Sequence, residues 1–384
     1  MMRLSSTLGL ILFTSLAAAG VYPPDVVDQL QETGIAKLKD YLAKNPAKNG
    51  CTFEKAVKRK EWSDLTIDER KEYTKAVLCL QSKPPKTSAP GAKSRFDDYV
   101  AVHIQMTPQV HGSTSFLPWH RYYVWHYENA LREECGYTGY QPYWNWDRYA
   151  KDPVNSPLFN GNDSSMGGNG EKVAHQGIPI PGAPAPYNVI PPADGGGCVT
   201  SGPFKNMSVN LGPMAATIPN LKSNPRSDGL GYNPRCLRRD VNKNSAAVTT
   251  ANYTYDLITK NNNVYWFQTV MEGQFNLGQW GVHSGGHYTV GGDPAGDFFV
   301  SPGDPVFWLH HGMIDRVWWI WQLQDLATRL TQVSKTMTMN NMPPSRNGTL
   351  DDKYGLGVLA PEVATRDMMD TMGGLDGKLC YIYV

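Results

Sequence analysis

The sequence is poor in charge and has no long basic stretch. Charged residues make up 18% of its 384 residues, below the average of about 25%, and the formal net charge is +1. Nucleic acids and anionic membrane surfaces attract clustered positive charge. Beyond the N-terminus, no apolar run approaches the ~20 residues that span a bilayer. We therefore expect no nucleic acid and no membrane as partner, and a small neutral molecule fits better.

Metal and redox motifs built on cysteine or carboxylate pairs are also missing. The six cysteines show no CxxC spacing of the kind found in zinc knuckles and thiol redox enzymes. No Glu-x-x-His pair of a carboxylate-bridged di-iron site occurs either. An even number of cysteines suits three disulfides in an oxidising compartment, although six cysteines allow fifteen pairings. We expect Cys198 and Cys236 to pair across the loop-rich middle of the chain. The six cysteines are Cys51, Cys79, Cys135, Cys198, Cys236 and Cys380.

The first 20 residues have the pattern of a cleaved secretory signal. Arg3 precedes an apolar run from Leu8 to Leu16, and small alanines follow it. We therefore expect a secreted, extracellular protein with a signal peptide at 1–20 and one domain at 21–384, acting as a monomer or weak oligomer. Four Asn-x-Ser/Thr sequons are plausible glycan sites in such a protein. They are Asn162, Asn206, Asn252 and Asn347.

Apolar periodicity predicts a mainly α fold. Residues 25–80 read as helical, and Thr66 with Glu69 resembles a capping box. Further helices are predicted over 96–107 (ended by Pro108), 118–134 (opened by Pro118), 266–275 and from 304 past 321 (with Asp304 as N-cap). Residues 151–263, rich in Gly, Pro and Asn, are predicted to be an irregular segment that shapes a site.

Two clusters of histidines stand out in this neutral chain. In the first, His103 lies on one predicted helix, His111 in the connection and His120 on the next helix. His126 follows His120 by six residues, about 120° further around the helix, so we expect it to point elsewhere and pack. His175, alone in a Gly-rich loop, is predicted to be an ordinary surface residue.

The second cluster begins with His283 and His287 at positions i and i+4. This spacing places two imidazoles on one helical face, about 5–6 Å apart at Cβ. The surrounding GVHSGGHYTVGG contains five glycines and is a poor helix by propensity, so tertiary contacts must hold it. His310 and His311 follow on a separate helix, about 100° apart, so only one can point at a given spot. Asp315 lies on the same face as His311, which makes His311 the inward candidate.

Two sets of three imidazoles imply two metal ions, and the ligand type favours copper. Two all-histidine zinc sites without an obvious general-base carboxylate would be unusual. Copper binds imidazole well and ranks high in the affinity order, and two facing three-histidine coppers can take O₂ between them. The plain alternative, a disulfide-bonded protein whose histidines only fill the core, predicts no bound copper.

Four segments resemble the tyrosinase family of type-3 copper proteins. HGSTSFLPWHRYYVWHYE (111–128) is similar to its first copper signature, and DPVFWLHHGMID (304–315) to its second. PYWNWD (142–147) and the terminal CYIYV (380–384) resemble the aromatic strand and the Tyr-x-Tyr element of its core. The resemblance implies an antiparallel four-helix bundle that encloses a dinuclear copper site, with long irregular loops and a few short strands. It also implies a short secreted fungal-type polyphenol oxidase.

Carried over by position, the resemblance assigns the site. The ligands of copper A would be His103, His111 and His120. Those of copper B would be His283, His287 and His311. His310 becomes a neighbour of these ligands, and Phe307 matches a phenylalanine that packs beside the site. Phe298 or Phe299 matches an aromatic that partly covers copper B in some members.

The sequence departs from the family pattern at several positions. Gln109 stands where many fungal members have a cysteine that forms a thioether with the second copper A histidine. Ser284 stands in the substrate pocket where hydroxylating members often have Asn. Glu272 is a candidate to orient a water there, with Gln279 as its competitor. Because the chain ends at Val384, we expect no C-terminal shielding domain.

The resemblance implies a catechol oxidase or tyrosinase that uses O₂ as co-substrate. Such an enzyme converts o-diphenols to o-quinones, and its substrates are small phenols; hydroxylation of monophenols and the preferred ring substituents stay open. Asp315 and Glu128 are candidates to accept the second imidazole N–H of copper ligands, or are salt-bridge partners. The alternative function is a haemocyanin-like reversible oxygen carrier, which the expected single domain argues against.

Overall fold

The structure is a computed structural model that describes residues 22–180, 182–218 and 220–384. The predicted signal segment, residues 1–20, lies outside the described residues.

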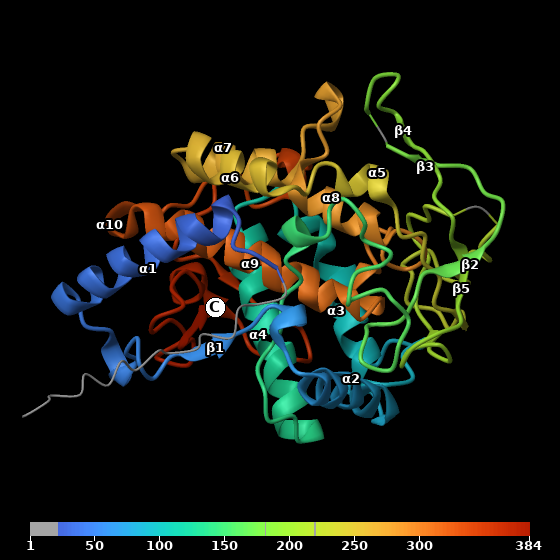
Figure 1. Cartoon of the computed structure of the whole chain (residues 1–384), viewed down its shortest axis with the longest axis horizontal. Helices are drawn as coiled ribbons and strands as arrows, with labels where there is room; N and C mark the ends of the chain where they lie inside the picture. The colour runs from blue at the N-terminus through green and yellow to red at the C-terminus, as the bar shows by residue number, and fades with distance from the viewer. Residues whose placement is uncertain (1–21, 181, 219) are drawn as a thin grey trace, which may run out of the picture.

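Four helices that carry the clustered histidines form the core of the fold, as predicted. They are α3 (Arg95–Val110), α4 (Phe116–Cys135), α8 (Gly281–Val290) and α9 (Val306–Gln324). Figure 1 shows α9 running through the middle of the molecule. Every residue of α9 from Val306 to Leu323 is buried, because α1, α4, α6 and α8 all pack against it. A helix without a polar face belongs at such a position.

Further helices surround this core. The longer ones are α1 (Val26–Lys44), α2 (Ile67–Ser82), α6 (Ala251–Lys260) and α7 (Val264–Glu272); the short ones are α5 (Lys243–Ala246) and α10 (Leu326–Arg329). Helix α2 packs on α3 and α4, and α7 packs on α8. The predicted capping box at the start of α2 is confirmed, because Glu69 N donates to Thr66 Oγ1 and Thr66 N donates to Glu69 Oε2.

Several predicted helix boundaries were wrong. Helix α3 continues through Pro108 to Val110, since a proline so close to the end of a helix removes only one intrahelical hydrogen bond and its ring lies on the exposed side of the last turn. Helix α4 starts two residues before Pro118, because a proline is tolerated anywhere in the first turn. Helix α7 begins and ends earlier than expected, and Gly273 caps it. Asp304 lies one residue before the N-cap, yet its Oδ1 still accepts from Val306 N at 2.9 Å.

The segment 151–263 is not wholly irregular, because it contains α5 and α6. Helix α6 was not predicted, because its Asn and Thr residues have low helix propensity. Leu257 and Ile258 of α6 are buried, and α6 packs against α1 and α9. Packing against other helices thus stabilises α6 although the helix propensity of its residues is low.

The strands are short and pair in two-stranded sheets. They are β1 (Val57–Arg59), β2 (Gly170–Lys172), β3 (Ile178–Pro179), β4 (Val189–Ile190), β5 (Gly196–Val199), β6 (Ser208–Val209), β7 (Arg235–Cys236), β8 (Lys353–Tyr354), β9 (Val363–Ala364) and β10 (Tyr381–Tyr383). β1 and β10 pair in parallel, with Val57 opposite Tyr381. The other pairs, β2–β5, β3–β4, β6–β7 and β8–β9, are antiparallel. The strands in the described residues therefore connect loops and chain ends, and they do not form a larger sheet.

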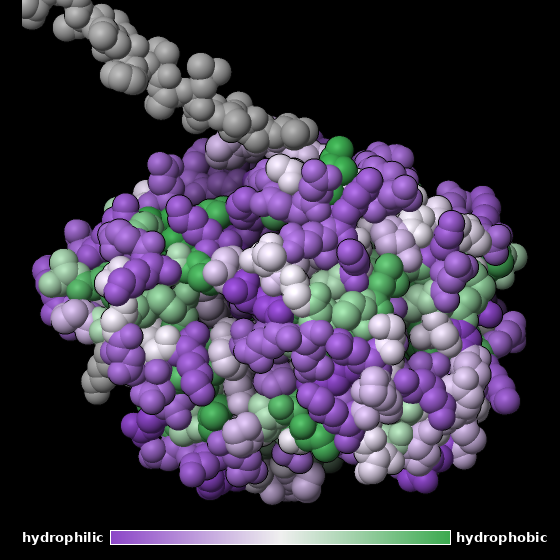
Figure 2. Space-filling view, turned by 90° about the horizontal axis from the view of Figure 1, so that it is seen from below, coloured by the Kyte–Doolittle hydropathy of each residue, from purple (hydrophilic) through white to green (hydrophobic). Residues whose placement is uncertain are grey.

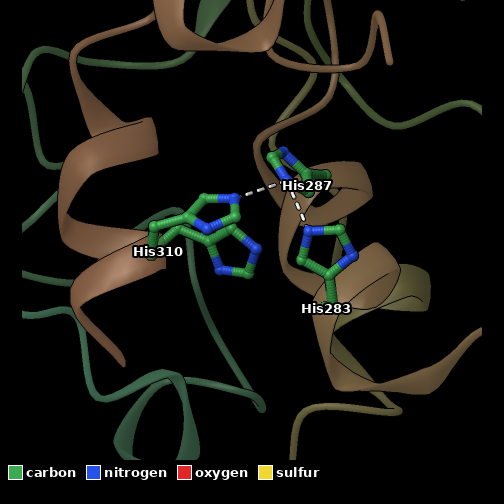
Figure 3. Close-up of side chains that lie close together, drawn as sticks. His283, His287 and His310 are labelled. Atoms are coloured by element: carbon green, nitrogen blue, oxygen red, sulfur yellow. Dashed lines mark hydrogen bonds between the residues drawn. The ribbon is translucent and has the colours of Figure 1, made fainter. Parts of the chain in front are cut away.

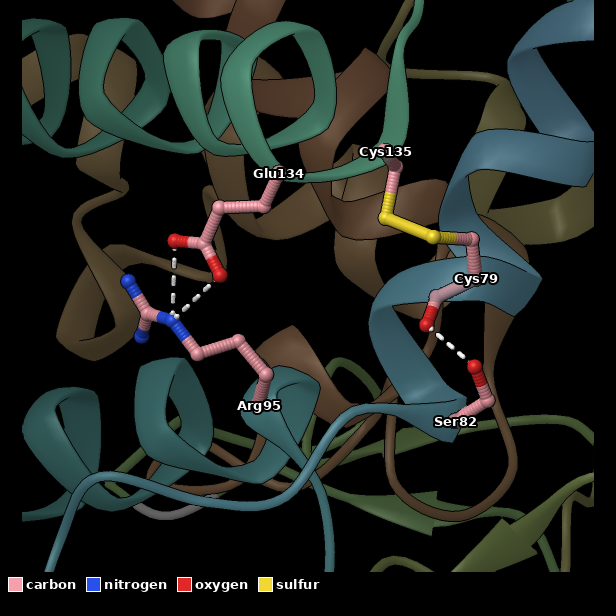
Figure 4. Close-up of a disulfide and its surroundings, with 5 residues drawn as sticks. All are labelled: Cys79, Ser82, Arg95, Glu134 and Cys135. Atoms are coloured by element: carbon pink, nitrogen blue, oxygen red, sulfur yellow. Dashed lines mark hydrogen bonds and ion pairs between the residues drawn. A yellow bond between two sulfur atoms is a disulfide. The ribbon is translucent and has the colours of Figure 1, made fainter.

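Three disulfides join distant segments. The predicted pair Cys198–Cys236 is confirmed, and the other pairs are Cys51–Cys380 and Cys79–Cys135. Cys79–Cys135 ties α2 to the end of α4 (Figure 4), next to the ion pair in which Arg95 Nε lies 3.1 Å from Glu134 Oε1. The disulfide thus cross-links α4 to α2, and the ion pair joins the outer ends of α3 and α4, which carry the first histidine cluster.

Hydrophilic residues cover most of the face seen in Figure 2, and hydrophobic ones occur there in small groups. None of the helices in the described ranges is both long and apolar enough to cross a bilayer.

Candidate metal centre

Three buried imidazoles meet where α3 and α4 converge. His103 lies on α3, His111 follows as its C-terminal cap, and His120 lies near the start of α4. Their ligand nitrogens lie within 4.8 Å of one another, and each residue is at most 4% exposed. The structure therefore brings together the first predicted trio.

In each of these rings a backbone carbonyl holds one nitrogen. Nδ1 of His103 donates to the carbonyl of Phe299 and Nδ1 of His120 to that of Phe116, both at 2.7 Å. His111 does the same within its own helix, at 3.1 Å. Because a carbonyl can only accept, Nδ1 carries the hydrogen and Nε2 keeps the lone pair that a metal needs. Among the described residues, Nε2 of His103 and Nε2 of His120 are buried without a hydrogen-bond partner, which fits metal ligands.

The second trio comes from α8 and α9. Nε2 of His287 lies 3.2 Å from Nε2 of His283 and 3.3 Å from Nε2 of His311, and Figure 3 shows side chains of the two helices facing one another. Imidazole nitrogens bound tetrahedrally at about 2.0–2.1 Å to one ion lie roughly 3.3 Å apart. The spacing of these nitrogens therefore suits ligands of one metal ion.

His310 adds a fourth imidazole to this group. Its ligand atom also lies within 4.8 Å of those of the trio, and its ring centroid is 4.5 Å from that of His287 (Figure 3). Both ring nitrogens of His310 are buried and have no partner in the part of the chain that the structure describes. Trp146 also lies next to the ring, with centroids 5.1 Å apart. His310 thus lies beside the trio and is wedged against an aromatic side chain.

Two glycines explain why α8, a segment of low helix propensity, forms a helix that holds two ligands. A Cβ atom at Gly286 would lie 2.2 Å from Cε1 of His310, and one at Gly285 would lie 2.5 Å from Cγ2 of Val248. Both distances are far below van der Waals contact. The two glycines let α8 approach α9 and the segment after α5 closely, so packing offsets their low helix propensity.

Burial keeps the clustered imidazoles neutral. It lowers the pKa of His103, His111 and His287 to about 3, and it lowers the pKa of His120, His283 and His311 below their ordinary value as well. Neutral imidazole is the form that binds metal. The site is therefore ready to bind metal at neutral pH without losing protons.

A cavity of about 580 Å³ opens onto both clusters. It reaches His111 of the first trio and His283 and His287 of the second, and Ser284 and Phe298 line it as predicted. A ligand inside this cavity would meet both metal positions at once.

Two predicted pocket residues lie elsewhere. Phe307 stacks on His311 with centroids 4.2 Å apart and is buried, so it packs behind the ligand and does not line the cavity. Phe299 is also absent from the lining, and its contribution is the carbonyl that holds His103. Phe298 lies over His111, at 4.6 Å between centroids, and so covers the first trio where coverage of the second was expected.

Glu272 and Gln279, the two candidates to orient a water, differ in their position relative to the cavity. Glu272 lines the cavity and Gln279 does not. Ser284 Oγ donates to the backbone carbonyl of Glu272 at 2.7 Å, because both lie where α7 and α8 meet. The Glu272 carboxylate accepts from Gly112 N, next to His111, at 2.6 Å.

Of the two roles considered for Asp315 and Glu128, the structure shows that of salt-bridge partner. Asp315 accepts from Arg121 Nε at 2.6 Å and from the hydroxyls of Tyr381 and Tyr383, each at 2.6 Å. Glu128 accepts from Arg59 Nε at 2.9 Å. Arg59 also lies 3.5 Å from Asp315, so these charges form one buried network that ties the C-terminal strand to α4 and α9. Burial would raise the pKa of Asp315, but the arginines and hydroxyls lower it below its ordinary value. Backbone carbonyls take the orienting role at the first trio.

The other two histidines lie outside the clusters. Nδ1 of His126 lies 3.0 Å from the hydroxyl of Tyr99, so His126 points away and packs, as predicted. His175 was expected at the surface, but its side chain is only 3% exposed and its Nε2 lies 3.4 Å from Oδ2 of Asp240. A Cβ atom at Gly196 would lie 2.6 Å from the His175 ring, so a glycine permits this burial.

Sequence reasoning missed Lys335, which lines the cavity. It follows the second signature by about 20 residues in an irregular segment, where no periodicity marks a position as inward. The carbonyls that hold the imidazoles were also missed, since every residue type carries one.

Comparison with known proteins places these residues in context. Residues 93–324 match the family model described as the common central domain of tyrosinase. That range includes both histidine trios and all four core helices.

Curated relatives match most of the chain. Tyrosinase-like protein orsC of Emericella nidulans is 42% identical over 310 residues, which cover 77% of this chain and 82% of the relative. Tyrosinase P of Aspergillus terreus is 38% identical over 330 residues, or 85% of this chain and 91% of the relative. N-acetyl-6-hydroxytryptophan oxidase ivoB of Emericella nidulans is 37% identical over 350 residues, 87% and 93% respectively.

A solved structure agrees over almost the whole length. A polyphenol oxidase variant from Thermothelomyces thermophila superposes with a TM-score of 0.86 at 44% sequence identity, covering 95% of this chain and 99% of that chain.

Proposed function

The chain belongs to the tyrosinase family of copper-dependent oxidoreductases, and we propose that it oxidises o-diphenols to o-quinones with O₂. Two catechols and one O₂ give two o-quinones and two waters. The observation that carries the proposal is the pair of histidine clusters, nearly all buried, beneath one open cavity.

We assign one copper ion to each trio. His103, His111 and His120 hold copper A. His283, His287 and His311 hold copper B. Convergent Nε2 atoms of the second trio and buried, unpartnered Nε2 atoms in the first support this assignment for the described residues. The bound copper pair supplies the electron-transfer chemistry by which O₂ is reduced and the phenol oxidised.

The protein holds the ligands in place and excludes water from the reaction. Carbonyls fix the rings of the first trio, which sets the direction of each lone pair before metal binds. Phe116 packs edge-on against His283 at 4.8 Å between centroids, and Phe307 stacks on His311. These aromatic walls shield the metal positions from bulk water, which strengthens electrostatic interactions within the site.

The substrate is a phenol larger than a single ring. A cavity of about 580 Å³ lies within the range of roughly 300–1,000 Å³ that holds drug-sized ligands. Phe275, Phe298 and Tyr288 offer it apolar surface. One relative is named for the oxidation of a substituted, bicyclic phenol, which is consistent with a bulky substituent.

Oxygen consumption by copper-loaded protein tests this function. We expect rapid uptake with catechols, and faster uptake when a neutral aromatic substituent extends the ring. Absence of uptake with every catechol tried, from protein that holds two copper ions, would exclude an oxidase and leave a reversible oxygen carrier. The wide cavity that reaches His111, His283 and His287 favours turnover, because a carrier has no need to admit a phenol.

The remaining part of the proposal is secretion. Three disulfides fit an oxidising compartment, and the asparagine of every sequon is exposed. A loss of mass after glycosidase treatment of protein secreted by a fungal host would support it, and an unchanged mass at all four sites would remove the glycans from the proposal.

A further inference from the structure

Lys335 places a positive charge inside the cavity. Its Nζ lies 3.0 Å from Oε1 of Glu272, and the two side chains are only 13% and 14% exposed. Both residues line the cavity that opens onto the histidine clusters. This is therefore a nearly buried ion pair at the place where a substrate would bind.

The backbone holds Lys335 in an unusual conformation. Its φ is +71°, in the left-handed region that residues with a side chain rarely adopt. The carbonyl of Lys335 accepts from Thr114 Oγ1 at 2.7 Å and from Gly348 N at 3.1 Å. Thr114 N also donates to the carbonyl of Thr336 at 3.0 Å. Such a conformation persists only where neighbouring contacts impose it, and it points to a function.

Three donors already occupy the carboxylate of Glu272. Gly112 N donates to Oε2 at 2.6 Å, and Gln268 Nε2 and Lys335 Nζ donate to Oε1 at 2.8 and 3.0 Å. A carboxylate has about four acceptor sites, so little capacity remains. This carboxylate is also the counter-charge of Lys335, whose side chain is nearly buried, and a buried charge needs such a partner.

The other carboxylate in the described lining, Asp297, is less accessible to a bound phenol than Glu272, whose side chain is 14% exposed. Asp297 is buried, and its oxygens accept from the backbone N–H groups of Met214, Ala215 and Phe299 at 2.7, 2.7 and 3.0 Å. Glu272 is therefore the candidate proton acceptor for a phenol in this cavity. The ammonium group of Lys335 is bonded to its carboxylate.

This ion pair affects monophenols and catechols differently. A catechol gives up two protons together with two electrons, and the protons end in water. A monophenol must first lose its hydroxyl proton while it keeps its electrons, and then one monophenol and one O₂ give one o-quinone and one water. That first step depends on a base in the pocket.

We propose that Lys335 is a specificity-determining residue that makes the enzyme selective for catechols, because its ion pair prevents Glu272 from accepting the proton of a bound monophenol. The proposal rests on the proposed phenol oxidase function. It predicts that selectivity depends on the pairing of these two side chains and requires no change in the copper ligands.

The ratio of monophenol to catechol oxidation rates tests the proposal and does not depend on the active fraction of each preparation. A general base typically contributes about 10²–10⁴-fold, so we expect Lys335→Met to raise the ratio by at least about tenfold. Lys335→Arg, which keeps the charge, should leave it near the wild-type value. Lys335→Met combined with Glu272→Gln should lose the gain. The surface control Lys172→Met removes an exposed ion pair with Asp194 and should leave the ratio unchanged.

A binding measurement provides a readout that does not require turnover. The phenolate of 4-nitrophenol is yellow, so its absorbance reports the ionised fraction of the bound phenol. We expect this fraction to rise in Lys335→Met and to fall back when Glu272→Gln is added. An unchanged rate ratio and an unchanged bound phenolate fraction in Lys335→Met would overturn the proposal, as would an equal rise in Lys335→Arg. If even the wild type oxidises no catechol, the proposed function fails, while the absorbance still tests Lys335.

Discussion

Replacing Gly286 by Ala would measure how closely α8 and α9 must approach for the site to form. A Cβ atom at this position would lie 2.2 Å from Cε1 and 2.5 Å from Nδ1 of His310. Ordinary contacts between carbon atoms are about 3.5–4.0 Å. The ring of His310 or helix α8 must therefore move by more than about 1 Å, and α8 carries His283 and His287.

Gly286→Ala should affect copper binding and the oxidation rate more strongly than the free energy of unfolding. Overpacking costs about 1–3 kcal/mol, and Ala in place of a helical Gly regains up to about 1 kcal/mol. The net loss in the free energy of unfolding is thus about 0–3 kcal/mol. A misplacement of about 1 Å can lower a rate by about 100-fold, because metal ligation tolerates little displacement. We expect Gly286→Ala to bind one copper per chain and to oxidise catechol at least about tenfold more slowly.

The assay is copper content per folded chain, measured beside catechol oxidation and a urea unfolding curve. His310→Ala removes the side chain that the new methyl group would meet, so Gly286→Ala combined with His310→Ala should regain the second copper. Gly286→Ala with two coppers and the wild-type rate would refute the packing argument. So would a double variant as defective as Gly286→Ala alone, provided that His310→Ala by itself binds two coppers.

Further predictions concern the buried charges and the ligand set. Asp315→Asn breaks a buried ion network and should lower the free energy of unfolding, measured in urea titrations, by about 3–5 kcal/mol. The control Asp194→Asn, at an exposed position, should change it little. Equal effects of the two substitutions would argue against the network. Burial lowers the pKa of the clustered imidazoles to about 3 in three cases, so the unfolded chain binds protons that the folded chain does not. Copper-free protein should therefore lose stability as the pH falls below about 6.5, by up to about 1.4 kcal/mol per pH unit for each imidazole, and a flat profile between pH 6.5 and 4.5 would contradict this. His311→Ala should lose one copper and catechol oxidation while His126→Ala keeps most of both, and similar losses in the two variants would show that the ligand assignment is mistaken.

The core helices could be predicted from the sequence because burial leaves a periodic signal. The α9 segment has apolar residues on every face, and the spacing of His283 and His287 predicts a common face of α8 even among glycines. Helix α6 could not be predicted, because its Asn and Thr residues lower its helix propensity and, of its buried residues, only Leu257 and Ile258 are apolar. Proline positions were also misleading, since Pro108 and Pro118 are tolerated inside terminal turns.

Part of the candidate site could also be predicted, because its histidines lie on helices and follow helical spacing. The helical phase that separates His310 from His311 indicated which imidazole joins the trio, and the short Nε2 distances agree. The partners that orient the imidazoles are mostly backbone carbonyls, which no residue type reveals. The burial of His175 depends on Gly196 and Asp240, from distant parts of the chain, and the same is true of the pairing of Lys335 with Glu272.

The number of copper ions bound by each chain tests the central claim most directly. Elemental analysis of copper-loaded, dialysed protein should give two ions per chain for the wild type. It should give one ion for His311→Ala and one for His120→Ala, because each variant lacks a ligand of a different trio. Wild-type protein that binds fewer than two ions, or variants that still bind two, would contradict a dinuclear site built from these two trios.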